Sequence, residues 1–206
     1  MNRLTFTNKM LNIFLYFLTY SFCGWIIETI YMSIYHGHFT KRGFLIGPIC
    51  IVYGIGTISV VFIFYYLKTH PLILFLCSSF LTTIVEFISG IVLKKLINHR
   101  LWDYSDNFAN LMGYICLRNT IIWGILSLLL VYRIHPIVIK SITSIPIKKK
   151  HLMCFIVLIL LFLDITISIY AGLNGKDSFV WVSQIVLRKI EDIENVSSRV
   201  VYFISH

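Results

Sequence analysis

The sequence has few charged residues for its length. Of its 206 residues only 13% are charged, whereas 58% are hydrophobic. A soluble domain contains about 25% charged and roughly 45–50% apolar residues, and the core of a soluble protein this size could not enclose so much apolar surface. The composition therefore excludes an ordinary soluble protein. It indicates an all-α integral membrane protein built as one compact domain.

Acidic residues are scarcer than basic ones, with 9 Asp and Glu against 18 Lys and Arg. Such an excess is compatible with nucleic-acid binding. In a chain this apolar, however, basic loops more often report membrane topology and contacts with anionic head groups. We therefore expect membrane lipids, and no nucleic acid, as partners.

Motifs for metal binding and nucleotide hydrolysis are also lacking. The five cysteines stand singly, without C-x-x-C or Cys/His ligand spacing, so neither a zinc site nor a disulfide framework is indicated. Gly175 and Lys176 do not belong to a phosphate-binding loop, because Tyr170 and Asp177 stand where glycine and Ser/Thr are needed. No H-E-x-x-H motif or nucleophile elbow occurs. We expect no metal, no cofactor and no catalytic residue.

Long apolar runs are what the sequence does contain. A helix needs about 20 mainly apolar residues to cross the hydrocarbon core of a bilayer. The windows that meet this length are about 11–35, 45–67, 72–97, 111–133 and 152–172. The first has no A-x-A-like cleavage site, so we expect a retained span rather than a signal peptide. The fourth is interrupted by Arg118 and Asn119, which indicates either a tilted helix or a short interfacial helix before a span from about Ile121.

Residues 1–173 are thus expected to form a transmembrane bundle, and residues 174–206 a separate element. Within 177–206, apolar residues recur at steps of three and four with charged residues between them. This pattern predicts an amphipathic helix that lies on the membrane or packs on a partner. A homo-oligomer is compatible with the sequence. Basic residues in the short loops favour a cytoplasmic N-terminus by a small margin.

Three acids, Glu28, Glu86 and Asp164, lie within the apolar windows. A charged side chain at the bilayer centre costs roughly 2.5–3.5 kcal/mol on insertion scales, so these acids should face protein, water or a ligand. Small and polar residues recur on the same helical faces, which we expect to line the bundle interior. The acids either wall a polar pathway, with Arg42 and Arg118 as countercharges, or form a structural lock between helices. In particular, we expect Arg118 to meet Glu28 or Glu86.

Further candidates flank these acids. Tyr31 shares a helical face with Glu28. Asp103 and Tyr104 belong to the polar aromatic stretch before the fourth window, where tyrosine and tryptophan are typical interfacial anchors. Asn110 enters the apolar zone and needs a partner there. The candidate substrate-binding residues are Glu28, Tyr31, Arg42, Glu86, Asp103, Tyr104, Asn110 and Arg118.

Several of these stretches occur together in a known family. They are GWIIETIY (24–31), KRGFLIGPICIVYGIG (41–56), the Glu86 and Gly90 pair, and WDYSDNFANLMGYICLRNTIIWG (102–124). In them the chain resembles the type IV ABC-transporter permease family, also called CmpB-like, over about residues 11–135. The resemblance implies a small multi-helix protein of the bacterial inner membrane, working with a separate ATPase subunit that could dock through 177–206. It supplies no substrate and no catalytic residue.

Three functions remain open at this point. The first is a permease-like transport component in which Glu28 and Glu86 line a substrate or proton path. The second is a non-catalytic membrane scaffold or regulator that acts through 177–206. The third, disfavoured by the absent catalytic motifs, is an intramembrane enzyme that acts on lipid head groups.

Overall fold

A computed structural model describes residues 3–98 and 100–175 together with Val182. The described part consists of helices and connecting loops, with one isolated β-bridge between Leu111 and Ile115. The elements in chain order are α1 (Arg3–His36), α2 (Ile51–Phe64), η1 (Tyr65–Thr69), α3 (Pro71–Ile97), α4 (Leu117–Leu129), η2 (Leu130–Ile134), α5 (His135–Thr143) and α6 (Ile147–Leu173). The amphipathic helix expected over 177–206 lies outside the described residues.

Five helices of the described part are long and apolar enough to cross a membrane, which confirms the all-α membrane class. Two of the predicted windows begin too early. The second helix starts at Ile51 instead of 45, and the fourth starts at Leu117 instead of 111. The fourth also continues as far as Thr143, so most of the stretch between the fourth and fifth predicted windows is helical. The chain is therefore a multi-pass membrane protein.

The helix ends follow local chemistry. Pro71 occupies the first turn of α3, where its missing N–H is not needed, and Asn98 ends α3 in the left-handed conformation with a φ of 57°. Pro136 follows η2, a π-helical turn that continues α4 into α5. A proline within a helix removes one backbone hydrogen bond and crowds the preceding turn. The π turn occupies the residues just before Pro136, where the proline would crowd a regular helix, and α4 and α5 remain continuous.

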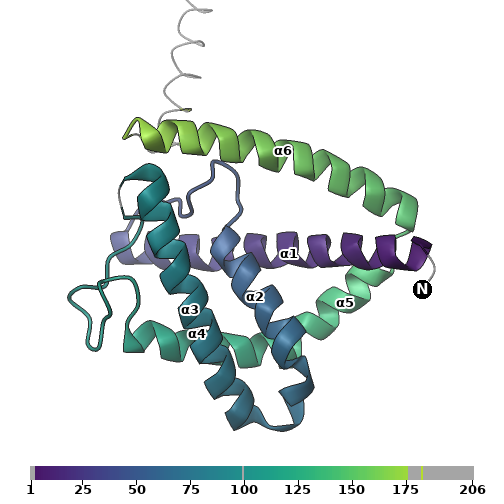
Figure 1. Ribbon diagram of the computed structural model, residues 1–206, viewed down its shortest axis with the longest axis horizontal. Coiled ribbons are helices and arrows are strands. Elements are labelled where there is room, and N and C mark those ends of the chain that lie inside the picture. Colours follow the sequence, from purple (N-terminus) through teal and green to yellow (C-terminus); the bar gives the residue numbers. More distant parts are fainter. Residues whose placement is uncertain (1–2, 99, 176–181, 183–206) are drawn as a thin grey trace, which may run out of the picture.

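Small residues bring the helices together. Helix α1 packs on α2 and α3 packs on α4, while α6 lies across the bundle on the side away from α4 (Figure 1). A Cβ atom at Gly24 would lie 2.2 Å from Cγ of Tyr53, and one at Gly124 would lie 2.1 Å from Oγ of Ser79. Both glycines therefore face a neighbouring helix, as the small-residue stripes predicted. Tyr31 is an exception, because it is 57% exposed.

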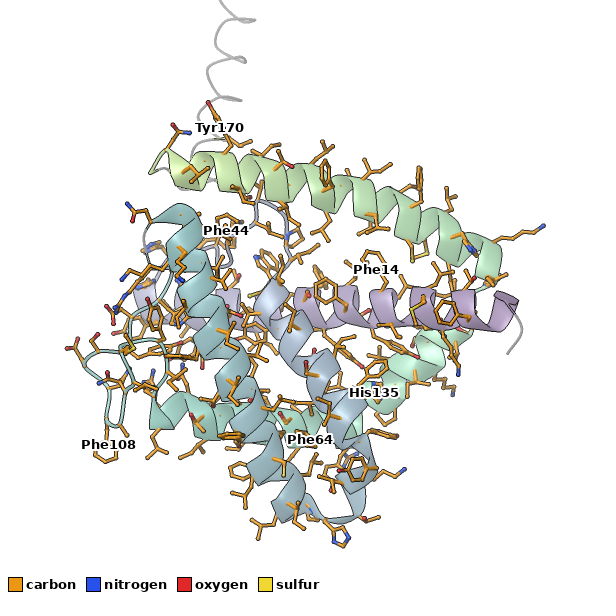
Figure 2. The ribbon with its side chains drawn as sticks, in the orientation of Figure 1. Phe14, Phe44, Phe64, Phe108, His135 and Tyr170 are labelled. Atoms are coloured by element: carbon orange, nitrogen blue, oxygen red, sulfur yellow. The ribbon has the colours of Figure 1, made fainter. Side chains whose placement is uncertain are left out.

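The apolar core and the acids Glu28 and Glu86 occupy different ends of the molecule. The core gathers around the N-terminal half of α1, the end of α2, η2 and α5. In it the buried His135 accepts or donates a 2.5 Å hydrogen bond with the hydroxyl of Tyr20, and it lies where α4 passes into α5 (Figure 2). The other end holds the two long loops, 37–50 and 98–116, and the acids Glu28 and Glu86. The candidate site is built there.

Candidate functional site: a carboxylate cluster under two loops

Loop 37–50 returns along α1 and places an arginine on it. Gly37, with a φ of 72°, turns the chain after α1. The loop ends where the backbone N–H of Cys50 donates to the carbonyl of Ser21, at 3.0 Å, in the middle of the same helix. Between these points Nε of Arg42 donates to Oε1 of Glu28 at 3.1 Å. This ion pair is only about a quarter exposed on either side chain, so the loop and α1 share a partly buried charge pair.

The same loop is fastened to α6 by Asp164. The backbone N–H groups of Ile46 and Gly47 each donate to this carboxylate at 2.8 Å, one to each oxygen. The hydroxyl of Ser168, one turn further along α6, adds a third bond at 3.1 Å. Phe44 of the same loop lies beneath the end of α6 (Figure 2). Asp164 thus satisfies two backbone donors of the loop, and it does not join Glu28 and Glu86.

Loop 98–116 folds back on α3 and carries Tyr104 into the bundle. The indole N–H of Trp102 donates to the carbonyl of Tyr114 at 3.0 Å, and the N–H of Tyr104 donates to the carbonyl of Gly113 at 2.8 Å. Gly113 has a φ of 72°, which is the left-handed region, and a Cβ there would crowd three side chains. Phe108 lies at the exposed tip of this loop (Figure 2). The loop is therefore held by its own hydrogen bonds.

Two predicted site residues, Asp103 and Asn110, form hydrogen bonds within this loop and not with Glu28 or Glu86. Asp103 accepts the hydroxyl and N–H of Ser105 and pairs with Arg100, and these bonds hold the pKa of its carboxyl below the usual value. Asn110 donates its amide to the carbonyls of Ser105 and Asn107. Both side chains are exposed. Their contacts are those of a loop that fixes its own shape.

Glu86 is the buried acid of the cluster, with 5% of its surface exposed. Oε1 accepts the Tyr104 hydroxyl at 3.3 Å, and Oε2 accepts the Trp123 indole N–H at 3.0 Å. Both donors are neutral. Within the described residues, no Lys, Arg or His side chain forms an ion pair with Glu86. Its carboxylate is thus solvated by hydrogen bonds but not neutralised by a cation.

The two acids belong to one electrostatic cluster. Burial raises the pKa of the Tyr104 hydroxyl above its ordinary value, and the negative charges of Glu86 and then Glu28 raise it further. Tyr53 lies beside the same carboxylates, and its ring centroid is 4.9 Å from that of Trp123. The cluster is defined here as Glu28, Arg42, Tyr53, Glu86, Tyr104 and Trp123, drawn from α1, α2, α3, α4 and both loops.

Cys50 lies at the edge of the cluster, next to Glu28. Its thiol donates to Oε2 of Glu28 at 3.7 Å. Burial, followed by the charge of Glu28, raises the pKa of this thiol to about 12. The neutral thiol is therefore the form present at physiological pH.

This shift predicts that Cys50 resists alkylation in the folded protein. A pKa of about 12 leaves about a thousandfold less thiolate at pH 8 than the unfolded thiol would have, and the thiolate is the reactive form. N-Ethylmaleimide labelling of the Cys50 peptide, followed by mass spectrometry at pH 8 with and without sodium dodecyl sulfate, measures the difference. Equal labelling rates in the two conditions would contradict it.

The structure brings together four of the predicted residues: Glu28, Arg42, Glu86 and Tyr104. The expected contact of Arg118 with Glu28 or Glu86 is wrong. Arg118 lies in the first turn of α4, is exposed, and takes part in neither ion pair of the described residues. Tyr53 and Trp123 were missing from the predicted site. The signal for them was available, because each immediately precedes a glycine, Gly54 or Gly124, that faces a neighbouring helix.

A helical multi-pass membrane protein with a buried carboxylate cluster is the class that this fold and site define. A family model described as "Putative ABC-transporter type IV" matches residues 15–169 of the chain. The chain belongs to this family and is a membrane protein related to transport. The matched range holds every residue of the cluster. No curated protein and no solved structure is significantly similar to the chain.

Proposed function

We propose that this chain is the membrane-spanning, permease-like component of a transporter, and that its cargo passes the carboxylates of Glu28 and Glu86. The observation that carries the proposal is Glu86, an acid buried at the contact of α3 and α4 whose hydrogen-bond donors among the described residues are neutral. An acid that serves only to lock helices together is usually fully compensated, whereas uncompensated intramembrane acids mark substrate or proton paths.

Each carboxylate of the cluster is covered by a loop. The Glu28–Arg42 pair joins a membrane helix to a loop, and Tyr104 reaches Glu86 from a second loop. A displacement of either loop would expose a carboxylate. The chain contains no nucleotide-binding motif, so a separate ATPase subunit would supply the energy, and 177–206 is the segment we propose for its docking. The N-terminus would face the cytoplasm.

Neutralising the acids one at a time tests this function. We expect the Glu86→Gln protein to insert and fold but to lose transport, because glutamine keeps the shape and one acceptor but removes the charge. A strain that lacks the gene, complemented with wild-type or variant chains, would be compared by untargeted mass spectrometry of the cells and their medium. The compound redistributed by the deletion should stay redistributed with Glu86→Gln and Glu28→Gln.

Asp106→Asn is the matched control, because Asp106 is an exposed carboxylate of loop 98–116 outside the cluster. It should restore the wild-type distribution. Folding of each variant is checked by the elution of the purified protein as a single species. Full restoration by both Glu28→Gln and Glu86→Gln would overturn the permease proposal and favour a scaffold.

A further inference from the structure

An apolar cavity lies directly behind the carboxylate cluster. Its volume is about 60 Å³, enough for several water molecules or a short aliphatic group. The residues that line it come from α1, α2, α3, α4 and η2, and none of them is charged. They are Tyr20, Cys23, Gly24, Ile27, Tyr53, Thr57, Thr82, Trp123, Leu126, Ser127, Leu129, Leu130 and Ile134.

The hydroxyl groups in this lining are already used. Thr57 donates to the carbonyl of Tyr53, Thr82 to that of Ser78, and Ser127 to that of Trp123. Each of these bonds runs to the preceding turn of the same helix, so these hydroxyls contribute little hydrogen bonding to the cavity. What the cavity offers a ligand is apolar surface and aromatic rings.

Two of those rings separate the cavity from the acids. Tyr53 and Trp123 line the cavity, and their ring centroids are 4.9 Å apart. On its other side Trp123 donates its indole N–H to Glu86. A hydrogen bond to a carboxylate increases the electron density of the donor ring, and a tryptophan face attracts cations even without it. A positive charge in the cavity would thus lie against the rings of Tyr53 and Trp123, with Glu86 bound at the N–H edge of the Trp123 ring.

The charges of the cluster also favour a cationic ligand. Arg42 pairs with Glu28 at 3.1 Å, which leaves Glu86 as the acid of the cluster that has no cationic partner among the described residues. An anionic cargo would be repelled by this site. A bare metal ion would find no group of three His, Cys, Asp or Glu side chains among the described residues. The site complements one positive charge carried by an apolar body.

The cavity also has an opening. Ile27 of α1 and Leu129 of α4 line it and are 46% and 47% exposed, on a surface made of apolar side chains. A ligand would enter between these two helices from the lipid side, and only an apolar molecule partitions there.

We infer that the cargo is an apolar organic cation, whose charge sits against Trp123 and Tyr53 near Glu86 and whose apolar group fills the cavity between α1 and α4. This inference rests on the proposed function and names its substrate class. Glu86 is the residue that selects the charge, and the cavity wall selects the apolar part.

Binding of n-butyltrimethylammonium to the full-length protein tests the inference. The purified chain would be placed in nanodiscs of phosphatidylcholine, and the radiolabelled cation measured by equilibrium dialysis against empty nanodiscs. We expect saturable binding that is about tenfold weaker in Glu86→Gln, since the charge and its effect on the Trp123 ring are lost together. Cys23→Leu, which narrows the cavity but leaves Glu86 in place, should also weaken binding. Asp106→Asn should bind as the wild type does.

Competition separates the charge from the apolar body. Unlabelled n-pentanol and pentanoate match the probe in length but are neutral and anionic, and neither should displace it. Displacement by pentanol as effective as by the unlabelled cation would overturn the inference, as would the absence of saturable binding or equal binding by Glu86→Gln. If the cation fails to bind while Glu86→Gln still loses transport, the proposed function is retained and the inference of a cationic cargo is overturned. If Glu28→Gln and Glu86→Gln both transport normally, the proposed function itself is overturned.

Discussion

Gly54→Ala is expected to lower the free energy of unfolding by about 3 kcal/mol. A Cβ atom at this position would lie 2.1 Å from Oγ of Ser21 and 2.6 Å from Cε2 of Phe17, both on α1. Neither distance is compatible with van der Waals contact, so the side chains of Ser21 and Phe17 must shift or α1 and α2 must move apart. The effect should reach the cluster, because the carbonyl of Ser21 also accepts the backbone N–H of Cys50.

Gly56→Ala is the matched control, two residues further along α2. Its added Cβ would lie 3.7 Å from Cγ2 of Thr82, which is an ordinary contact. Alanine also removes the cost of a glycine within a helix, so this variant should be unchanged or more stable by roughly 0.5–1 kcal/mol. Thermal unfolding of both proteins in the same detergent, followed by circular dichroism, measures the difference. If the two variants melt together, the close packing of α1 on α2 is contradicted.

The number and type of the helices could be predicted because both depend on the local sequence. A run of about 20 apolar residues specifies a span wherever it occurs. The starts of α2 and α4 could not be predicted in the same way. Residues 45–50 and 111–116 are largely apolar, and hydropathy counts them as helix. In the structure they belong to loops. Leu45 in the first and Tyr114 and Cys116 in the second are buried, whereas Leu111 and Met112 are exposed. Hydropathy reports removal from water, which a loop packed on protein achieves as well as a span.

The candidate site could be predicted only in part, for a related reason. Glu28 and Glu86 stand out because an acid in an apolar window needs an explanation. Tyr104 and Trp123, two of the donors to Glu86, lie 18 and 37 residues away, on a loop and on another helix, and only the tertiary fold brings them together. Arg118 was expected to serve as the countercharge because it lies inside the fourth predicted window, 111–133, where a charge needs a partner. Since α4 begins at Leu117, Arg118 falls in its first turn, where a long side chain reaches the surface.

Asp164→Ala is expected to release loop 37–50 from α6. The carboxylate accepts the N–H groups of Ile46 and Gly47 at 2.8 Å each, and alanine leaves both donors without a partner. Hydrogen bonds to a charged group contribute roughly 1.5–3 kcal/mol each, so we expect a loss of about 3 kcal/mol in the free energy of docking the loop. Trypsin should then cleave after Lys41 and Arg42, which mass spectrometry of the fragments detects.

Two further variants separate the docking of the loop from the ion pair that the loop carries. Ser168→Ala removes one hydroxyl from Asp164 but leaves both backbone bonds, so the loop should stay protected. Arg42→Gln removes the partner of Glu28 but leaves the Asp164 contacts intact, so cleavage after Lys41 should stay slow. If Arg42→Gln exposes Lys41 as much as Asp164→Ala does, the loop is held by its ion pair with α1 and not by α6. If only Asp164→Ala exposes it, α6 controls whether Arg42 reaches Glu28, and a movement of α6 would change the charge of the cluster.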